Sequence, residues 1–167
     1  MSLRKRTFTA LPLIGTLFVV VQYAPDWVFF LFGQAFIVAV LVEFYNLAER
    51  KQLLPQKIVG CAMALLVSLT FYFPAIPLEA ALFGGLLLAA VYFVVTFNTL
   101  EKLPYFPASF AVTVIGMVYI SFPLNFLFRI RAEAGPFTLY CLFAVVFLGG
   151  TGAYFIGKPF GRKKMTP

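Results

Sequence analysis

The sequence predicts an all-α integral membrane protein, a bundle of about six transmembrane helices with both chain ends on the cytoplasmic side. Hydrophobic residues make up 62% of the 167 residues, and the mean hydropathy is +0.97. Charged residues make up only 11%, against about 25% in an ordinary soluble domain. So few charges cannot cover a water-exposed surface, so lipid must be the main solvent. The length suits one domain over residues 1–167.

A membrane-spanning helix needs about 20 apolar residues to cross a hydrocarbon core of about 30 Å. Six segments meet this requirement, with Pro25-Asp26 and Pro74 to Pro77 predicting turns between them and Pro123 predicting a kink inside the fifth. These predicted spans cover residues 9–24, 27–48, 57–73, 78–97, 108–128 and 135–156. The first is read as a retained helix, because no signal-peptide cleavage site is evident after it.

The basic residues predict the orientation, because cytoplasmic loops carry an excess of Lys and Arg. With the N-terminus inside, eleven basic residues lie on the cytoplasmic side: Arg4, Lys5, Arg6, Arg50, Lys51, Lys57, Lys102, Lys158, Arg162, Lys163 and Lys164. Two, Arg129 and Arg131, lie outside. Basic clusters between apolar runs indicate topology and contact with anionic lipid, so we expect no nucleic-acid partner.

Several classes of chemistry are disfavoured by the residue inventory. The chain has no histidine, which removes Ser-His and Cys-His pairs and every His-ligated metal site. Cys61 and Cys141 lie far apart inside apolar runs, which argues against a disulfide framework or a zinc site. In residues 78–97, Ala80/Gly84, Ala81/Gly85 and Gly85/Ala89 repeat at four-residue spacing. This pattern favours close helix packing over a substrate groove.

Ionisable groups inside or at the ends of a span are candidates for function. Glu43 lies near the inner end of the second span, where it would bind a cation or orient a lipid headgroup. Its alternative is a purely interfacial role, paired with Arg50 or Lys51. Arg129 and Arg131 end the fifth span, as ligands for a lipid phosphate or as plain interfacial anchors.

The stretch from Gly149 to Lys164 is the most informative part of the chain. Its first part is glycine-rich and lies at the inner end of the sixth span. Its second part contains the basic residues Lys158, Arg162, Lys163 and Lys164. It matches neither a dinucleotide fingerprint nor a Walker loop. Backbone N–H groups beside Lys and Arg are the groups that bind a polyphosphate. Helix-packing glycines before a topology signal are an equally good interpretation.

This stretch resembles the signature of the phosphatidate cytidylyltransferase family, the CDP-diacylglycerol synthases. The family run is Asp-Ser/Thr-Gly-Ala-Tyr-x-x-Gly-x-x-Phe-Gly-Lys/Arg-x-Lys-x-x-Pro, and residues 150–167 read GTGAYFIGKPFGRKKMTP. Weaker agreement covers the Arg4-Lys5-Arg6 start through Leu11, Glu43-Phe44, and the stretch from Gly116-x-x-Tyr119 to Leu127-x-Arg129. The resemblance covers the whole chain as the N-terminal part of that family.

The resemblance implies an enzyme that transfers cytidylyl from CTP to phosphatidate, giving CDP-diacylglycerol and diphosphate in phospholipid synthesis at the cell (inner) membrane. It implies Mg²⁺ as the cofactor and CTP and phosphatidate as the partners. A homodimer is a further expectation, separate from the resemblance. The resemblance assigns Tyr154, Lys158, Arg162, Lys163 and Lys164 to nucleotide phosphates, and Arg129 and Glu43 to the lipid headgroup.

Two departures from the family pattern matter. Gly150 stands at the position of the family's catalytic Asp, so no metal ligand is assigned. The chain also ends at Pro167, before the family's Ser-Pro-Lys-Lys-Thr-like segment and the His-Gly-Gly-x-x-Asp-Arg-x-Asp signature. We therefore expect a fragment that is inactive alone. The rival hypotheses are a non-catalytic scaffold or transporter-like bundle and another CTP-using lipid enzyme, such as a polyprenol kinase relative.

Overall fold

The fold is all-helical throughout the part that the computed structural model describes, residues 3–99, 101 and 103–160. Side chains are described at residue 12 and, within those ranges, from residue 14 to residue 157. The long helices are α1 (Leu3–Tyr23), α2 (Asp26–Arg50), α3 (Lys57–Tyr72), α4 (Leu78–Thr96), α5 (Phe106–Gly116) and α6 (Phe122–Phe160). The 3₁₀ turn η1 (Leu103–Tyr105) precedes α5, and the π-helix η2 (Met117–Ser121) follows it.

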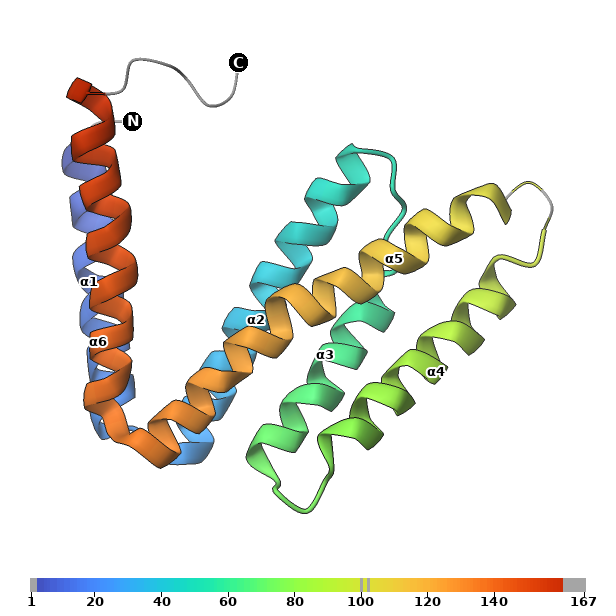
Figure 1. Ribbon diagram of the computed structural model, residues 1–167, viewed down its shortest axis with the longest axis horizontal. Helices are drawn as coiled ribbons and strands as arrows, with labels where there is room; N and C mark the ends of the chain where they lie inside the picture. The colour runs from blue at the N-terminus through green and yellow to red at the C-terminus, as the bar shows by residue number, and fades with distance from the viewer. Residues whose placement is uncertain (1–2, 100, 102, 161–167) are drawn as a thin grey trace. The chain divides into compact units, whose positions relative to one another are not determined.

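Two compact units make up the chain, residues 1–129 and 130–167. The prediction of one transmembrane domain stays a prediction. In the first unit, short connections at 51–56 and 73–77 turn the chain between α2, α3 and α4, so consecutive helices run antiparallel (Figure 1). The helices α5 and η2 then pack against α2 and α3.

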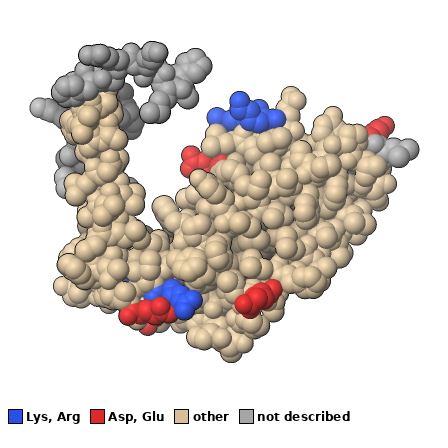
Figure 2. Space-filling model, viewed as in Figure 1, with Lys and Arg blue, Asp and Glu red and all other residues tan. Residues whose placement is uncertain are grey.

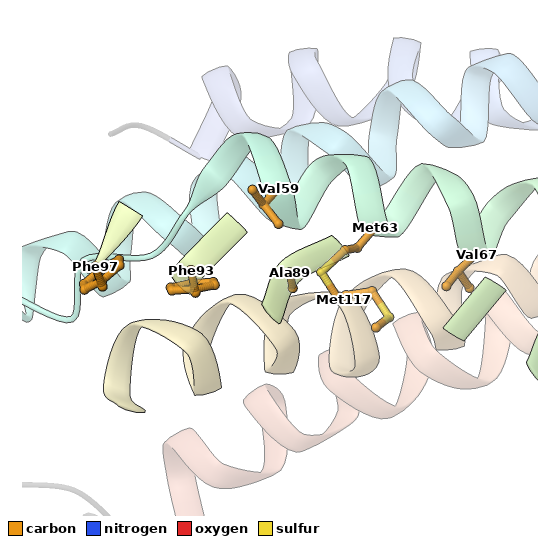
Figure 3. Packing of buried hydrophobic residues seen from close by; sticks show 7 residues of the cluster. All are labelled: Val59, Met63, Val67, Ala89, Phe93, Phe97 and Met117. Carbon is orange, nitrogen blue, oxygen red and sulfur yellow. The ribbon is translucent and has the colours of Figure 1, made fainter. Parts of the chain in front are cut away.

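The core of the first unit lies between α3, α4 and the α5–η2 segment (Figure 3). Seven buried residues form it: Val59, Met63, Val67, Ala89, Phe93, Phe97 and Met117. Small residues on α4 permit this packing, since Gly85 lies against Met63 and Ala89 is fully buried. Gly84, on the neighbouring stripe, has open space around it. The predicted packing role therefore holds for the Gly85–Ala89 stripe.

The predicted kink at Pro123 takes the form of a π-helical turn just before it. Phe122 N–H bonds to the carbonyl of Met117, five residues earlier. Proline has no N–H, and its ring collides with the carbonyl four residues before it. Widening the preceding turn relieves both problems, so η2 is the physical response to Pro123.

The predicted break after residue 128 is wrong in its position. The structure continues α6 as helix through Arg129 and Glu133, and the backbone departs from helical geometry at Gly135 (φ 80°, ψ 170°). Glycine adopts positive φ without the steric cost that a side chain brings. Pro136 follows and disfavours helical geometry at the residue before it. Divided at Gly135, the described helices correspond in order to the six predicted spans.

By length and composition, three of the described stretches are long and apolar enough to cross a membrane. They are Asp26–Arg50, Leu78–Thr96 and the continuous stretch Leu103–Gly157, with shorter apolar helices at Ile14–Tyr23 and Lys57–Tyr72. The chain is therefore a helical membrane protein. The number of passes and the cytoplasmic placement of both ends stay predictions.

Candidate functional site

The glycine-rich run that the sequence singled out lies on the second half of α6. Gly150, Tyr154 and Lys158 follow one another at four-residue spacing, which places them along one stripe of the helix. Tyr154 is 64% exposed, and a Cβ added at Gly150 would meet no atom within 4 Å. The side chain of Lys158 and the residues Arg162, Lys163 and Lys164 lie outside the described residues.

The two predicted headgroup residues lie near opposite ends of the first unit. Phe128, directly before Arg129, packs its ring against Phe29 and Phe30 at the start of α2. Glu43 lies about 20 Å further along α2, at a rise of about 1.5 Å per residue. The structure therefore does not bring Arg129 and Glu43 into one headgroup site.

Glu43 is exposed on α2, and no ion pair within the described residues joins it to Arg50 or Lys51. The ion pair that the structure shows at this end of α2 joins Lys57 and Glu49. Lys57 Nζ lies 2.8 Å from Glu49 Oε2 and donates to Asn46 Oδ1 at 2.6 Å. The lipid-headgroup role and the interfacial role of Glu43 therefore both stay predictions.

Several charged side chains of the first unit lie at the end that holds residues 50–57. The rest of the visible surface carries only a few separate charged groups (Figure 2). Hydrogen bonds fix the connection 51–56. Gln56 N–H donates to Thr113 Oγ1 at 3.0 Å, and Ser109 Oγ donates to the carbonyl of Leu54. Gln52 and Leu54 adopt positive φ, at 59° and 47°. Such strain persists only where the surrounding structure determines it, and at Leu54 the helix α5 supplies a contact of this kind.

Tyr45 connects α2 to α3 and α5 near this end of the unit. Its side chain is fully buried, and its hydroxyl donates to the carbonyl of Thr113 at 2.9 Å. The ring lies against Gly60 of α3 and Gly116 of α5, and a Cβ at either glycine would lie 2.6 Å from a ring carbon. Only glycine lets the three helices approach this closely. The pairing was not predicted, although a tyrosine and two glycines inside apolar runs were available as a signal.

A second buried polar group lies deeper in the bundle. It contains Gln34 of α2, Ser121 of η2 and Asn125 of α6, joined by hydrogen bonds. Sequence reasoning missed this group as well. The available signal was an amide side chain inside each of two apolar runs, since polar groups in a membrane are costly unless they find partners.

The Mg²⁺ that the family resemblance implies stays a prediction, because Mg²⁺ binds through as few as one or two carboxylates together with substrate phosphates. No group of three or more Cys, Asp or Glu side chains among the described residues is close enough to hold a metal ion. Gly150 offers no ligand where the family pattern has a carboxylate.

Fold and sequence together define a helical membrane protein with a glycine-rich helix stripe that leads into a basic run. The comparison with protein-family models matches the cytidylyltransferase family over residues 4–167. The chain therefore belongs to the cytidylyltransferase family. This result confirms the resemblance found in the sequence and supports a CTP-using nucleotidyl transfer. No curated protein and no solved structure matches the chain.

Proposed function

We propose that the chain serves cytidylyl transfer from CTP to phosphatidate in the cell membrane, with both of its ends in the cytoplasm. A phosphate oxygen of phosphatidate attacks the α-phosphorus of CTP, the bond between the α-phosphorus and the bridging oxygen to the β-phosphorus breaks, and diphosphate leaves. The products are CDP-diacylglycerol and diphosphate.

One observation carries this proposal: a chain of the cytidylyltransferase family is built largely of apolar helices. A nucleotidyltransferase embedded in a bilayer meets acceptors that are themselves lipids. Transfer from CTP needs an acceptor with a nucleophilic oxygen, and a lipid phosphate monoester supplies one. Phosphatidate is the simplest lipid of this chemistry.

The stripe Gly150, Tyr154 and Lys158 supports the placement of the nucleotide. It lies on the last turns of α6, with open space at Gly150 and an exposed ring at Tyr154. In the proposal, Tyr154 and the basic residues 158, 162, 163 and 164 contact the phosphates of CTP. Cations that approach phosphate in a site of low dielectric bind it strongly.

Two labels on CTP distinguish the proposed reaction from phosphoryl transfer. The chain, extended by the C-terminal segment of the family signature, is reconstituted in liposomes that contain either phosphatidate or a polyprenol, with CTP labelled at the α- or the γ-phosphorus. Cytidylyl transfer moves only the α-label into phosphatidate, whereas a polyprenol kinase moves only the γ-label into the polyprenol. Label transfer from the γ-position alone would refute the proposal in favour of a kinase.

The second candidate function is lipid binding without catalysis, by a non-catalytic member of the family. It is favoured by Gly150, which stands where the family has its Asp, and by the lack of a metal-ligating cluster among the described side chains. The same liposomes decide this case through the Gly150→Asp variant. If neither the unchanged chain nor the variant moves either label into lipid, the non-catalytic function stands.

A further inference from the structure

The strongest feature outside the proposed site is the buried amide network inside the first unit. Gln34 is 7% exposed, whereas Asn125 and Ser121 are fully buried. Gln34 lies on α2, about 12 Å along the helix from its first residue, so it lies well inside the apolar span. A polar side chain at this depth is expensive unless every polar atom has a partner.

The direction of each hydrogen bond in this network follows from chemistry. Asn125 Nδ2 lies 2.7 Å from the carbonyl oxygen of Ser121, which can only accept. The amide of Asn125 must therefore donate there, and its Oδ1 faces Gln34. Gln34 Nε2 then donates to Asn125 Oδ1 at 3.4 Å. Reversing either amide would place two acceptors or two donors against each other.

This order leaves Gln34 Oε1 as an acceptor. It is buried, and no described residue donates a hydrogen bond to it. A buried acceptor without a donor is destabilising, because it has lost its hydrogen bonds to water and gained none in the protein. Because the atom is enclosed within the unit, a side chain from another protein or a lipid headgroup cannot reach it without unpacking the helices. The donor has to be small.

We infer that the first unit binds a single water molecule that donates a hydrogen bond to Gln34 Oε1. A buried water needs two to four polar partners, and this region contains further acceptor atoms. The hydroxyl groups of Ser68 and Ser121 both donate to the carbonyl of Ala64, at 2.8 and 3.3 Å, and their own oxygens can still accept. This polar layer joins α2, α3 and η2.

The position of the water gives it a structural consequence. Ser121 ends the π-helix η2, and Asn125 contacts both its carbonyl and its hydroxyl. Gln34 is the α2 side chain that joins this pair, through a bond of 3.4 Å, which is long for a hydrogen bond. A water at Gln34 Oε1 adds a second bonded contact to the α2 side of η2. The inference does not depend on the proposed reaction.

Solid-state NMR of the full chain in bilayers of deuterated lipid tests the inference. The chain is labelled uniformly with ¹⁵N, so that side-chain and backbone amides are both detected, and magnetisation is transferred from water to protein for short mixing times. The Gln34 signal is identified by its loss in the Gln34→Met variant. If that variant does not fold, Gln34→Glu, which keeps the size and an acceptor oxygen, identifies the signal instead.

We expect the Gln34 side-chain amide to gain intensity from water several times faster than the backbone amides of Met63 and Val67, which are also buried but lie in the apolar core. Equal build-up at Gln34 and at these two controls would overturn the inference. Build-up that appears only with protonated lipid would also overturn it, because the donor would then be a lipid group.

Discussion

The close contact of Tyr45 with Gly60 and Gly116 makes Gly60→Ala a sharp test of the packing. A Cβ at Gly60 would lie 2.6 Å from Tyr45 Cζ and 2.7 Å from Cε2, whereas ordinary contact begins near 3.4 Å. The nearest atom, Tyr45 Oη, would lie only 2.1 Å from that Cβ, so the ring or the helix must move by more than an ångström. The ring cannot rotate freely away, since Gly116 lies against it and its hydroxyl bonds to Thr113.

Overpacking of a well-packed core costs typically about 1–3 kcal/mol, and the double confinement of this ring favours the upper end. We expect Gly60→Ala to lower the free energy of unfolding by about 3 kcal/mol. The matched control is Gly84→Ala on α4, where an added Cβ meets no atom within 4 Å. Alanine there should leave stability unchanged or raise it by about 0.5–1 kcal/mol through helix propensity.

Unfolding in mixed micelles with increasing sodium dodecyl sulfate, followed by circular dichroism, measures both variants. A third variant identifies the cause. Combining Gly60→Ala with Tyr45→Leu should destabilise less than the two single changes added together, because the smaller side chain removes the collision. If Gly60→Ala unfolds at the same detergent fraction as Gly84→Ala, the proposed close contact between α2 and α3 is wrong.

Four further predictions follow from the structure and the proposed function. Gly135→Ala should cost about 1–3 kcal/mol in the same unfolding assay, because its φ of 80° strains a side chain; an unchanged midpoint would contradict this. Lys57→Gln should cost at most about 1 kcal/mol, since its partner Glu49 is 46% exposed, and a larger loss would show that this ion pair is stronger than solvent screening allows. In the chain extended by the C-terminal segment of the family signature, Gly150→Asp should raise transfer of the α-label from CTP to phosphatidate, and equal rates would show that this position does not supply the family's carboxylate. A cysteine at Thr166, in a chain without Cys61 and Cys141, should react with an impermeant reagent only from the cytoplasmic face, so labelling from outside would reverse the predicted orientation.

Hydropathy and helix-breaking residues were enough to predict the secondary structure, because both act locally along the chain. Long apolar runs form helices in a bilayer, since every backbone group must find its partner within the segment. Prolines and short polar stretches then end the helices. The error after residue 128 has a local cause too. The basic residues Arg129 and Arg131 suggested a loop, whereas Glu133 and Ala134 favour helix and Gly135-Pro136 supplies the break.

The candidate site could be predicted only where it lies on one continuous stretch. The run from Gly150 to Lys158 is one helical stripe, so its spacing alone places Gly150, Tyr154 and Lys158 on one side. Glu43 and Arg129 belong to different helices. The distance between them depends on where α2 lies along its axis relative to α6. That offset is a property of packing, which neither segment encodes by itself.

The sequence alone therefore determined the class of the chain, its apolar helices and its membership of the cytidylyltransferase family. Tertiary structure decided which residues meet: Tyr45 with Gly60 and Gly116, and Gln34 with Asn125. The physical reason is that helix formation depends on neighbours three to five residues apart. A contact between residues 91 positions apart depends on the register of two helices, which is set by the fit of all the side chains between them.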